Sequence, residues 1–152
     1  MSRSAGLVAT LAATVAAGLV VSACGSTALS ASQLRSFATR SCDQARKRTD
    51  EIPTPVTPDG GASFLSRGVA ALEPEQKTLA SLQPPQTLRT DYNAAVSASG
   101  QELAALRLTL ARLRGGADPV TSIKDLQRRL TPLERRADTA WHALDVPGCA
   151  VR

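Results

Sequence analysis

The chain has 152 residues, of which 43% are apolar and 20% are charged, and its formal net charge is +5. This balance excludes a disordered chain and a polyelectrolyte, and the length predicts a single domain. Aromatic residues make up only 3%, alanine occurs 26 times, and arginine outnumbers lysine 15 to 3. A core of alanine and leucine with few aromatic or β-branched residues favours helices over sheet.

Residues 1–23 are predicted to be an export signal rather than part of the fold. Arg3 supplies a positive charge, and residues 7–21 carry none. An apolar run of this length would make about 22 Å of helix, which is short for a membrane span and typical of a signal-peptide core. The run ends in Val21-Ser22-Ala23-Cys24, which resembles the lipobox of bacterial lipoproteins.

The lipobox resemblance implies cleavage after Ala23 and a diacylglyceryl group on the Cys24 thiol, with acyl chains such as palmitate holding the protein in the membrane. We therefore expect a lipoprotein signal peptide (1–23), a lipidated tether (24–33) and a helical bundle domain (34–152). The expected location is the cell membrane, lipid-anchored on the extracytoplasmic side. Two alternatives are an ordinary secretory signal that leaves Cys24 a plain thiol, and an uncleaved anchor, which needs a longer apolar run.

The remaining cysteines, Cys42 and Cys149, are predicted to form a disulfide, because an exported chain enters an oxidising compartment. The bridge would close a loop of 108 residues, which is worth about 4–5 kcal/mol on the chain-entropy model. Two unpaired buried thiols are the alternative. A zinc site or a nucleophilic cysteine is not expected, since His142 is the only histidine.

Four stretches of the exported chain have the three- and four-residue periodicity of amphipathic helices. The first covers residues 31–51 and ends in a segment, 52–61, that contains three prolines and two glycines. The second covers residues 62–82, and Gln83-Pro84-Pro85 ends it. Pro74 either kinks this second helix or starts a new one.

The third and fourth stretches carry the clearest apolar stripes. The third stripe consists of Leu88, Tyr92, Ala95, Ser99, Leu103, Leu106, Leu110 and Leu113, and the fourth of Ile123, Leu126, Leu130, Leu133, Ala137, Trp141 and Leu144. Gly115-Gly116 is predicted to end the third helix, and Asp118 and Pro119 to begin the fourth. Pro132 lies off the stripe, so it should bend the fourth helix without ending it.

Helices joined by short turns pack antiparallel, so the sequence predicts an all-α protein, an up-down four-helix bundle. In this arrangement the start of the first helix and the end of the fourth lie at the same end of the bundle. The tail after the fourth helix can then bring Cys149 to Cys42. One disulfide between the N- and C-terminal parts is therefore included in the predicted fold.

Three short segments together resemble small actinobacterial lipoproteins. They are Phe37-Ala38-Thr39-Arg40-Ser41-Cys42, Leu82-Gln83-Pro84-Pro85 before a long helix, and Val146-Pro147-Gly148-Cys149. The resemblance implies an exported helical lipoprotein. It transfers no activity and no site residues, because the function of these proteins is mostly unassigned.

No motif of a known catalytic or cofactor site occurs, so we expect neither an enzyme nor a cofactor or metal. Glu134, Asp138 and Asp145 flank the fourth stripe and are expected to be solvated. One histidine cannot supply the two Glu-x-x-His pairs of a di-iron bundle. Trp141 is expected in the core because it continues the stripe, and His142 is expected on the outer face.

The leading functional prediction is a non-catalytic interaction module at the outer face of the cytoplasmic membrane, with an envelope protein as partner. The alternative is a carrier or sensor for a small apolar ligand held between the helices. The alanine-rich stripe (Ala94, Ala95, Ala98, Ala104, Ala105) either brings helices close together or leaves a cavity. A closed apolar cavity of several hundred cubic ångströms would favour the carrier, and a core without one would favour the interaction module.

A basic strip is predicted on the fourth helix, and it comprises Lys124, Arg128, Arg129, Arg135 and Arg136. One interpretation is ordinary solvated surface. The other is contact with anionic lipid headgroups or acidic wall polymers, in which each cation contributes up to about 1 kcal/mol. Nucleic acid is not an expected partner, because export removes the protein from it and the aromatic residues needed for base stacking are few.

Overall fold

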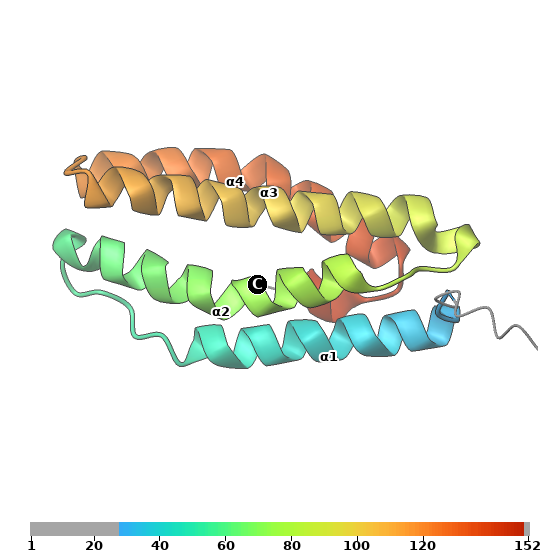
Figure 1. Ribbon diagram of the computed structural model, residues 1–152. Helices are drawn as coiled ribbons and strands as arrows, with labels where there is room; N and C mark the ends of the chain where they lie inside the picture. The colour runs from blue at the N-terminus through green and yellow to red at the C-terminus, as the bar shows by residue number, and fades with distance from the viewer. Residues whose placement is uncertain (1–27, 151–152) are drawn as a thin grey trace, which may run out of the picture.

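The computed structural model describes residues 28–150, which form four long helices and three short 3₁₀ turns with no strand (Figure 1). The long helices are α1 (Ala31–Asp50), α2 (Gly61–Ser81), α3 (Arg89–Arg114) and α4 (Pro119–Ala143). The turns are η1 (Pro58–Gly60), η2 (Gln86–Leu88) and η3 (Pro147–Cys149). Each helix runs antiparallel to the one before it. The predicted all-α, up-down four-helix bundle is confirmed.

Local sequence explains where the helices begin and end. The Ser30 hydroxyl accepts the Gln33 amide N–H (3.2 Å), and the Gln33 side chain accepts the Ser30 N–H (2.9 Å), which makes a capping box before α1. As predicted, Asp118 caps α4, because its Oδ1 accepts the Thr121 N–H at 2.8 Å. Gly116 follows α3 with a φ of +86°, a conformation that favours glycine at helix ends.

The two internal prolines do not end their helices. Pro74 lies within α2 and Pro132 within α4, and both are exposed. Each proline lacks the N–H that would bond the carbonyl four residues earlier in its own helix, and on an exposed face water can bond that carbonyl instead. The Thr78 hydroxyl also donates to the Pro74 carbonyl at 2.8 Å. The alternative of a new helix after Glu73 is therefore ruled out, and the position of Pro132 off the stripe is confirmed.

The core consists of two apolar clusters at different levels along the bundle. In the larger cluster Trp141 is fully buried and packs edge-on against Tyr92, with ring centroids 5.9 Å apart. The smaller cluster is built around Leu65, Leu110 and Leu126. The expectation that Trp141 is a core residue is confirmed, and its neighbour His142 is exposed, as predicted.

The C-terminal segment closes the fourth side of the bundle at one end. Along the chain each helix packs on the next, α3 on α4 most extensively, whereas the backbones of α1 and α4 do not approach each other closely within the described residues. After α4 the chain turns back, and η3 packs against α1 with Val146 and Cys149 buried (Figure 1). The Cys42–Cys149 disulfide joins the two, with Cα atoms 5.2 Å apart. The predicted disulfide is confirmed.

Both clusters and both disulfide cysteines lie within residues 28–150, so this part of the chain contains its own core. Leu29 packs at the edge of the larger cluster, and its N–H donates to the Gln83 carbonyl at 2.8 Å. The predicted signal segment 1–23 and Cys24 lie outside the described residues. Within residues 28–150, every helix is too short or too polar to cross a bilayer.

Candidate functional site

A cavity of about 380 Å³ lies between the four helices. On α2, α3 and α4 its lining residues fall between those of the two apolar clusters, so the cavity occupies the middle of the bundle. Its apolar wall consists of Ala45, Leu72, Leu103, Leu106 and Leu130. The small Ala45 on α1 and the separation of α1 from α4 explain why side chains do not fill this level.

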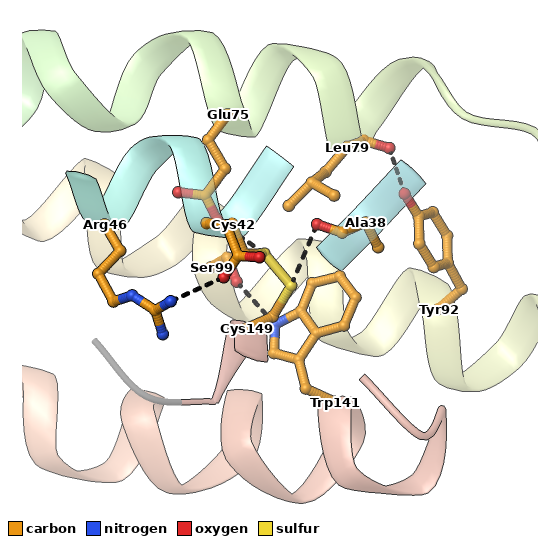
Figure 2. Close-up of a disulfide and its surroundings, with 10 residues drawn as sticks. Ala38, Cys42, Arg46, Glu75, Leu79, Tyr92, Ser99, Trp141 and Cys149 are labelled. Carbon is orange, nitrogen blue, oxygen red and sulfur yellow. Dashed lines mark hydrogen bonds and ion pairs between the residues drawn. A yellow bond between two sulfur atoms is a disulfide. The ribbon is translucent and has the colours of Figure 1, made fainter. Parts of the chain in front are cut away.

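Glu75 projects from α2 into the cavity and is only 3% exposed. It shares its helix face with Leu72 and Leu79, three residues before it and four after it, and both of these face the interior. Its Oε1 lies 3.3 Å from Cys42 Sγ (Figure 2). A disulfide sulfur carries no proton, so this is a van der Waals contact rather than a hydrogen bond.

Glu102 supplies a second buried carboxylate from α3, and it is 7% exposed. It also lines a neighbouring cavity of about 190 Å³, together with Glu134 and Asp138 of α4. Ionised carboxylates at this depth are costly unless other groups compensate them. The two buried glutamates therefore give this level of the bundle a polar wall between its two apolar clusters.

Exposed side chains line the outer part of the main cavity. They are Arg46 and Asp50 of α1 and Glu134 of α4. Arg46 also forms an ion pair with Asp43, with 2.9 Å between Nη2 and Oδ1. Four carboxylates and one guanidinium thus line the cavity, although the whole chain has a net charge of +5. Acidic side chains therefore outnumber basic ones around the cavity.

Ser99 links the cavity wall to the only tryptophan of the chain. Its buried hydroxyl lines the cavity and accepts the Trp141 Nε1–H at 3.4 Å (Figure 2). Because the indole donates to a cavity residue, the emission of Trp141 should respond when the cavity is filled.

The predicted site residues fall into separate regions of the structure. Cys42 lines the cavity, and its partner Cys149 belongs to the segment whose Gly148 also lines it. The basic-strip residues Lys124, Arg128, Arg129, Arg135 and Arg136 are all exposed. Arg128 forms an ion pair with Asp125. Arg129 and Arg136 line a shallow groove between α3 and α4, which sets them apart from the rest of the strip.

The flanking acids of α4 have a larger role than expected. Glu134 is exposed, as a solvated flank requires, but it also lines both cavities. Asp138 is half-buried and lines the smaller one. The predicted solvated flank thus holds for Glu134 and Asp145, which are exposed, whereas Asp138 is half-buried beside Ala150 of the C-terminal segment.

Sequence reasoning missed Glu75 and Glu102, although a signal was present. Both residues lie on the inner faces of their helices, Glu75 between Leu72 and Leu79 and Glu102 beside Leu103. A charged residue within an apolar stripe is the pattern that could have indicated them. Within residues 28–150, no group of three or more His, Cys, Asp or Glu side chains is placed to hold a metal ion.

The fold and the cavity define a class: a disulfide-linked helical bundle with an internal cavity lined by carboxylates. Comparison with protein-family models, curated proteins and solved structures gives no match for this chain. The resemblance to actinobacterial lipoproteins stays a prediction, and the functional argument rests on the geometry of the site.

Proposed function

We propose that the protein is a carrier or sensor that binds a small organic cation with an apolar body in the cavity between its helices. The observation that carries this proposal is the cavity of about 380 Å³, since small-molecule pockets measure about 300–1,000 Å³. Of the two functions considered from the sequence, the cavity favours the carrier over the interaction module. The buried carboxylates change the preferred ligand from an apolar molecule to a cationic one.

The chemistry of the wall supports this ligand class. An ammonium or amidinium group can donate to Glu75 and Glu102 in an interior where charge–charge attraction is stronger than in water. The same carboxylates repel an anion. The apolar body of the ligand would pack against Leu72, Leu103 and Leu106, which line the same space.

The proposed entry route runs between α1 and α4. The backbones of these helices are not close within the described residues, and the exposed Asp50 and Glu134 line the cavity from α1 and α4. Two carboxylates at an entrance attract a cation and bring it toward the buried pair. Ligand entry by this route needs no separation of the packed pairs α1–α2, α2–α3 and α3–α4.

The proposed location is the outer face of the cytoplasmic membrane, with Cys24 lipidated. This rests on the lipobox resemblance of Val21-Ser22-Ala23-Cys24, which follows a charge-free apolar run. Mass spectrometry of the protein from its own membrane tests it. A mature N-terminus without acyl chains on Cys24 would contradict the anchor and leave the cavity proposal intact.

Ligand class is tested with three molecules that share one chain and differ in charge: hexylammonium, hexanol and hexanoate. Protein comprising residues 25–152 is titrated with each while Trp141 emission is recorded, and calorimetry gives the dissociation constants. We expect hexylammonium to bind most tightly, hexanol more weakly, and hexanoate not at all. Equal affinities for all three, or no binding of hexylammonium at millimolar concentration, would refute the proposal.

Two substitutions and one control locate the binding. Glu75→Gln and Glu102→Gln should each weaken hexylammonium binding by about tenfold or more, because a charge-assisted hydrogen bond contributes about 1.5–3 kcal/mol, and leave hexanol binding unchanged. Glu73→Gln is the matched control on α2, since Glu73 points outward and pairs with Arg107 at 2.7 Å. Loss of binding in the control alone, or in none of the variants, would place the ligand elsewhere.

A further inference from the structure

The outer surface between α3 and α4 contains a shallow groove that the proposed ligand site does not use. Its space measures about 490 Å³. Small or apolar residues form its floor, namely Ala104, Ala105, Leu108, Pro132 and Leu133, and Leu108 is 45% exposed. An exposed leucine of this kind on a concave surface suits contact with a partner.

Arg129 and Arg136 are the charged residues of this groove. They are seven residues apart on α4, which places them on the same side of the helix and about 10 Å apart along its axis. Within the described part of the chain, no carboxylate lines the groove. By contrast, Glu134 and Asp138 line the two cavities, so α4 separates a basic flank from an acidic one.

We propose that this groove docks on a membrane surface that contains anionic lipids. Arg129 and Arg136 would each bind a phosphate oxygen of a headgroup, for which the guanidinium fork is well suited. Leu108 and the apolar floor would contact the boundary between headgroups and acyl chains. The exposed Lys124, Arg128 and Arg135 on the same helix would add long-range attraction.

The complementarity favours a lipid surface over an acidic protein. A bilayer presents phosphates beside apolar chains, and the groove presents arginines beside an apolar floor. The groove is also shallow, with no buried polar group along its floor that would fix the register of a peptide backbone. The inference is independent of the cation site, since the two regions share no lining residue.

The test is flotation of residues 25–152 with vesicles of phosphatidylcholine alone or with phosphatidylglycerol added. Binding is expected only with the anionic vesicles, and it should weaken as salt rises. The double variant Arg129→Glu/Arg136→Glu should lower binding at least about tenfold. The matched control Lys124→Glu/Arg135→Glu carries the same change of charge on the same helix outside the groove, and it should lower binding by less than about threefold.

A third variant tests the apolar floor. Leu108→Ser should reduce the binding that persists at high salt, while Trp141 emission and helical content confirm that each variant is folded. If both double variants lose vesicle binding equally, the binding depends on total positive charge and not on the groove, and the proposal is overturned. Equal binding to neutral vesicles, or no vesicle binding at all, would also overturn it. So would an effect of Arg129→Glu/Arg136→Glu on polyglutamate binding alone, which would indicate an acidic protein partner.

Discussion

Residues of the same chemical type play different roles in this protein when the helix turns them toward different surroundings. Glu73 and Glu75 are two positions apart on α2, about 200° around the helix axis. One is exposed and pairs with Arg107, and the other is buried in the cavity wall. Trp141 and His142 are similarly divided between the core and the outer face. Direction relative to the bundle axis thus determines which charged groups belong to the site.

Tyr92 provides a prediction at this scale. It is 2% exposed, and its hydroxyl donates to the Leu79 carbonyl near the end of α2 at 2.6 Å. Tyr92→Phe should lower the free energy of unfolding by about 1–2 kcal/mol at pH 7, because it removes a buried hydrogen bond. Urea denaturation of the two proteins measures the difference.

The same pair of proteins should respond differently to high pH. Burial raises the pKa of Tyr92 above its ordinary value of 10.0. Because the pKa is raised on folding, the hydroxyl's contribution to the free energy of unfolding is complete below pH 10.0. This contribution is lost as the pH rises toward the folded-state pKa. The stability difference from Tyr92→Phe should therefore shrink above pH 10.0. A constant difference across this range would contradict the role assigned to the hydroxyl.

At the scale of the helices, most of the fold could be predicted because its signals are local. The sequence predicts where the last two helices lie from the Asp118 cap, the Gly115-Gly116 helix end and two long apolar stripes. The structure agrees with these positions. The cavity could not be predicted in this way. It depends on four helices leaving space at one level, and on α1 and α4 lying apart, which no single stripe specifies. Helical projection alone places Arg129 and Arg136 to one side of the basic strip, but only packing against α3 shows that these two residues line a groove.

The Asp118 cap gives a prediction for a helix terminus. Hydrogen bonds with Thr121 lower the pKa of the exposed Asp118 carboxyl. The side chain of Thr121 has the largest effect, and its backbone amide has the next largest. Because the folded-state pKa is lowered, the cap stabilises the protein above the ordinary value of 3.8 and loses its effect as pH falls through the lower folded-state value. Asp118→Ala should therefore lower the melting temperature at pH 7 but not in strong acid.

Asp118→Asn is the control for this cap. Asparagine accepts the same Thr121 N–H but does not titrate. The difference in melting temperature between Asp118→Asn and Asp118→Ala should therefore be the same at neutral and at acid pH. If Asp118→Ala lowers the melting temperature by the same amount at pH 7 and in strong acid, ionisation of the carboxyl contributes nothing to the cap.

At the scale of the whole molecule, the disulfide holds together a bundle whose fourth side is incomplete. The C-terminal segment covers one end of the opening between α1 and α4, and the Arg35 side chain donates to the Leu144 carbonyl at 2.9 Å where α4 ends. The opposite side of α4 carries the arginine-lined groove. In the proposed account, one helix separates a cation-binding interior from a membrane-facing surface.

Removal of the disulfide should affect stability and binding together. Cys42→Ser/Cys149→Ser should lower the free energy of unfolding by about 4–5 kcal/mol, because the unfolded chain regains the entropy of the closed loop. It should also weaken hexylammonium binding, since Cys42 and Gly148 line the cavity. Denaturation and calorimetry with and without reductant measure both effects. Reductant should change the unmodified protein and leave the double variant unaffected.

The central claim, that the cavity is a binding site for an organic cation, is tested most directly by NMR of the protein with hexylammonium. Nuclear Overhauser effects should connect the ligand's methylene protons to the methyl groups of Leu72, Leu103 and Leu106, which line the cavity. The exposed methyl groups of Leu108 in the groove should show none. Contacts with Leu108 alone, or none with the three cavity leucines in the saturated protein, would contradict the account.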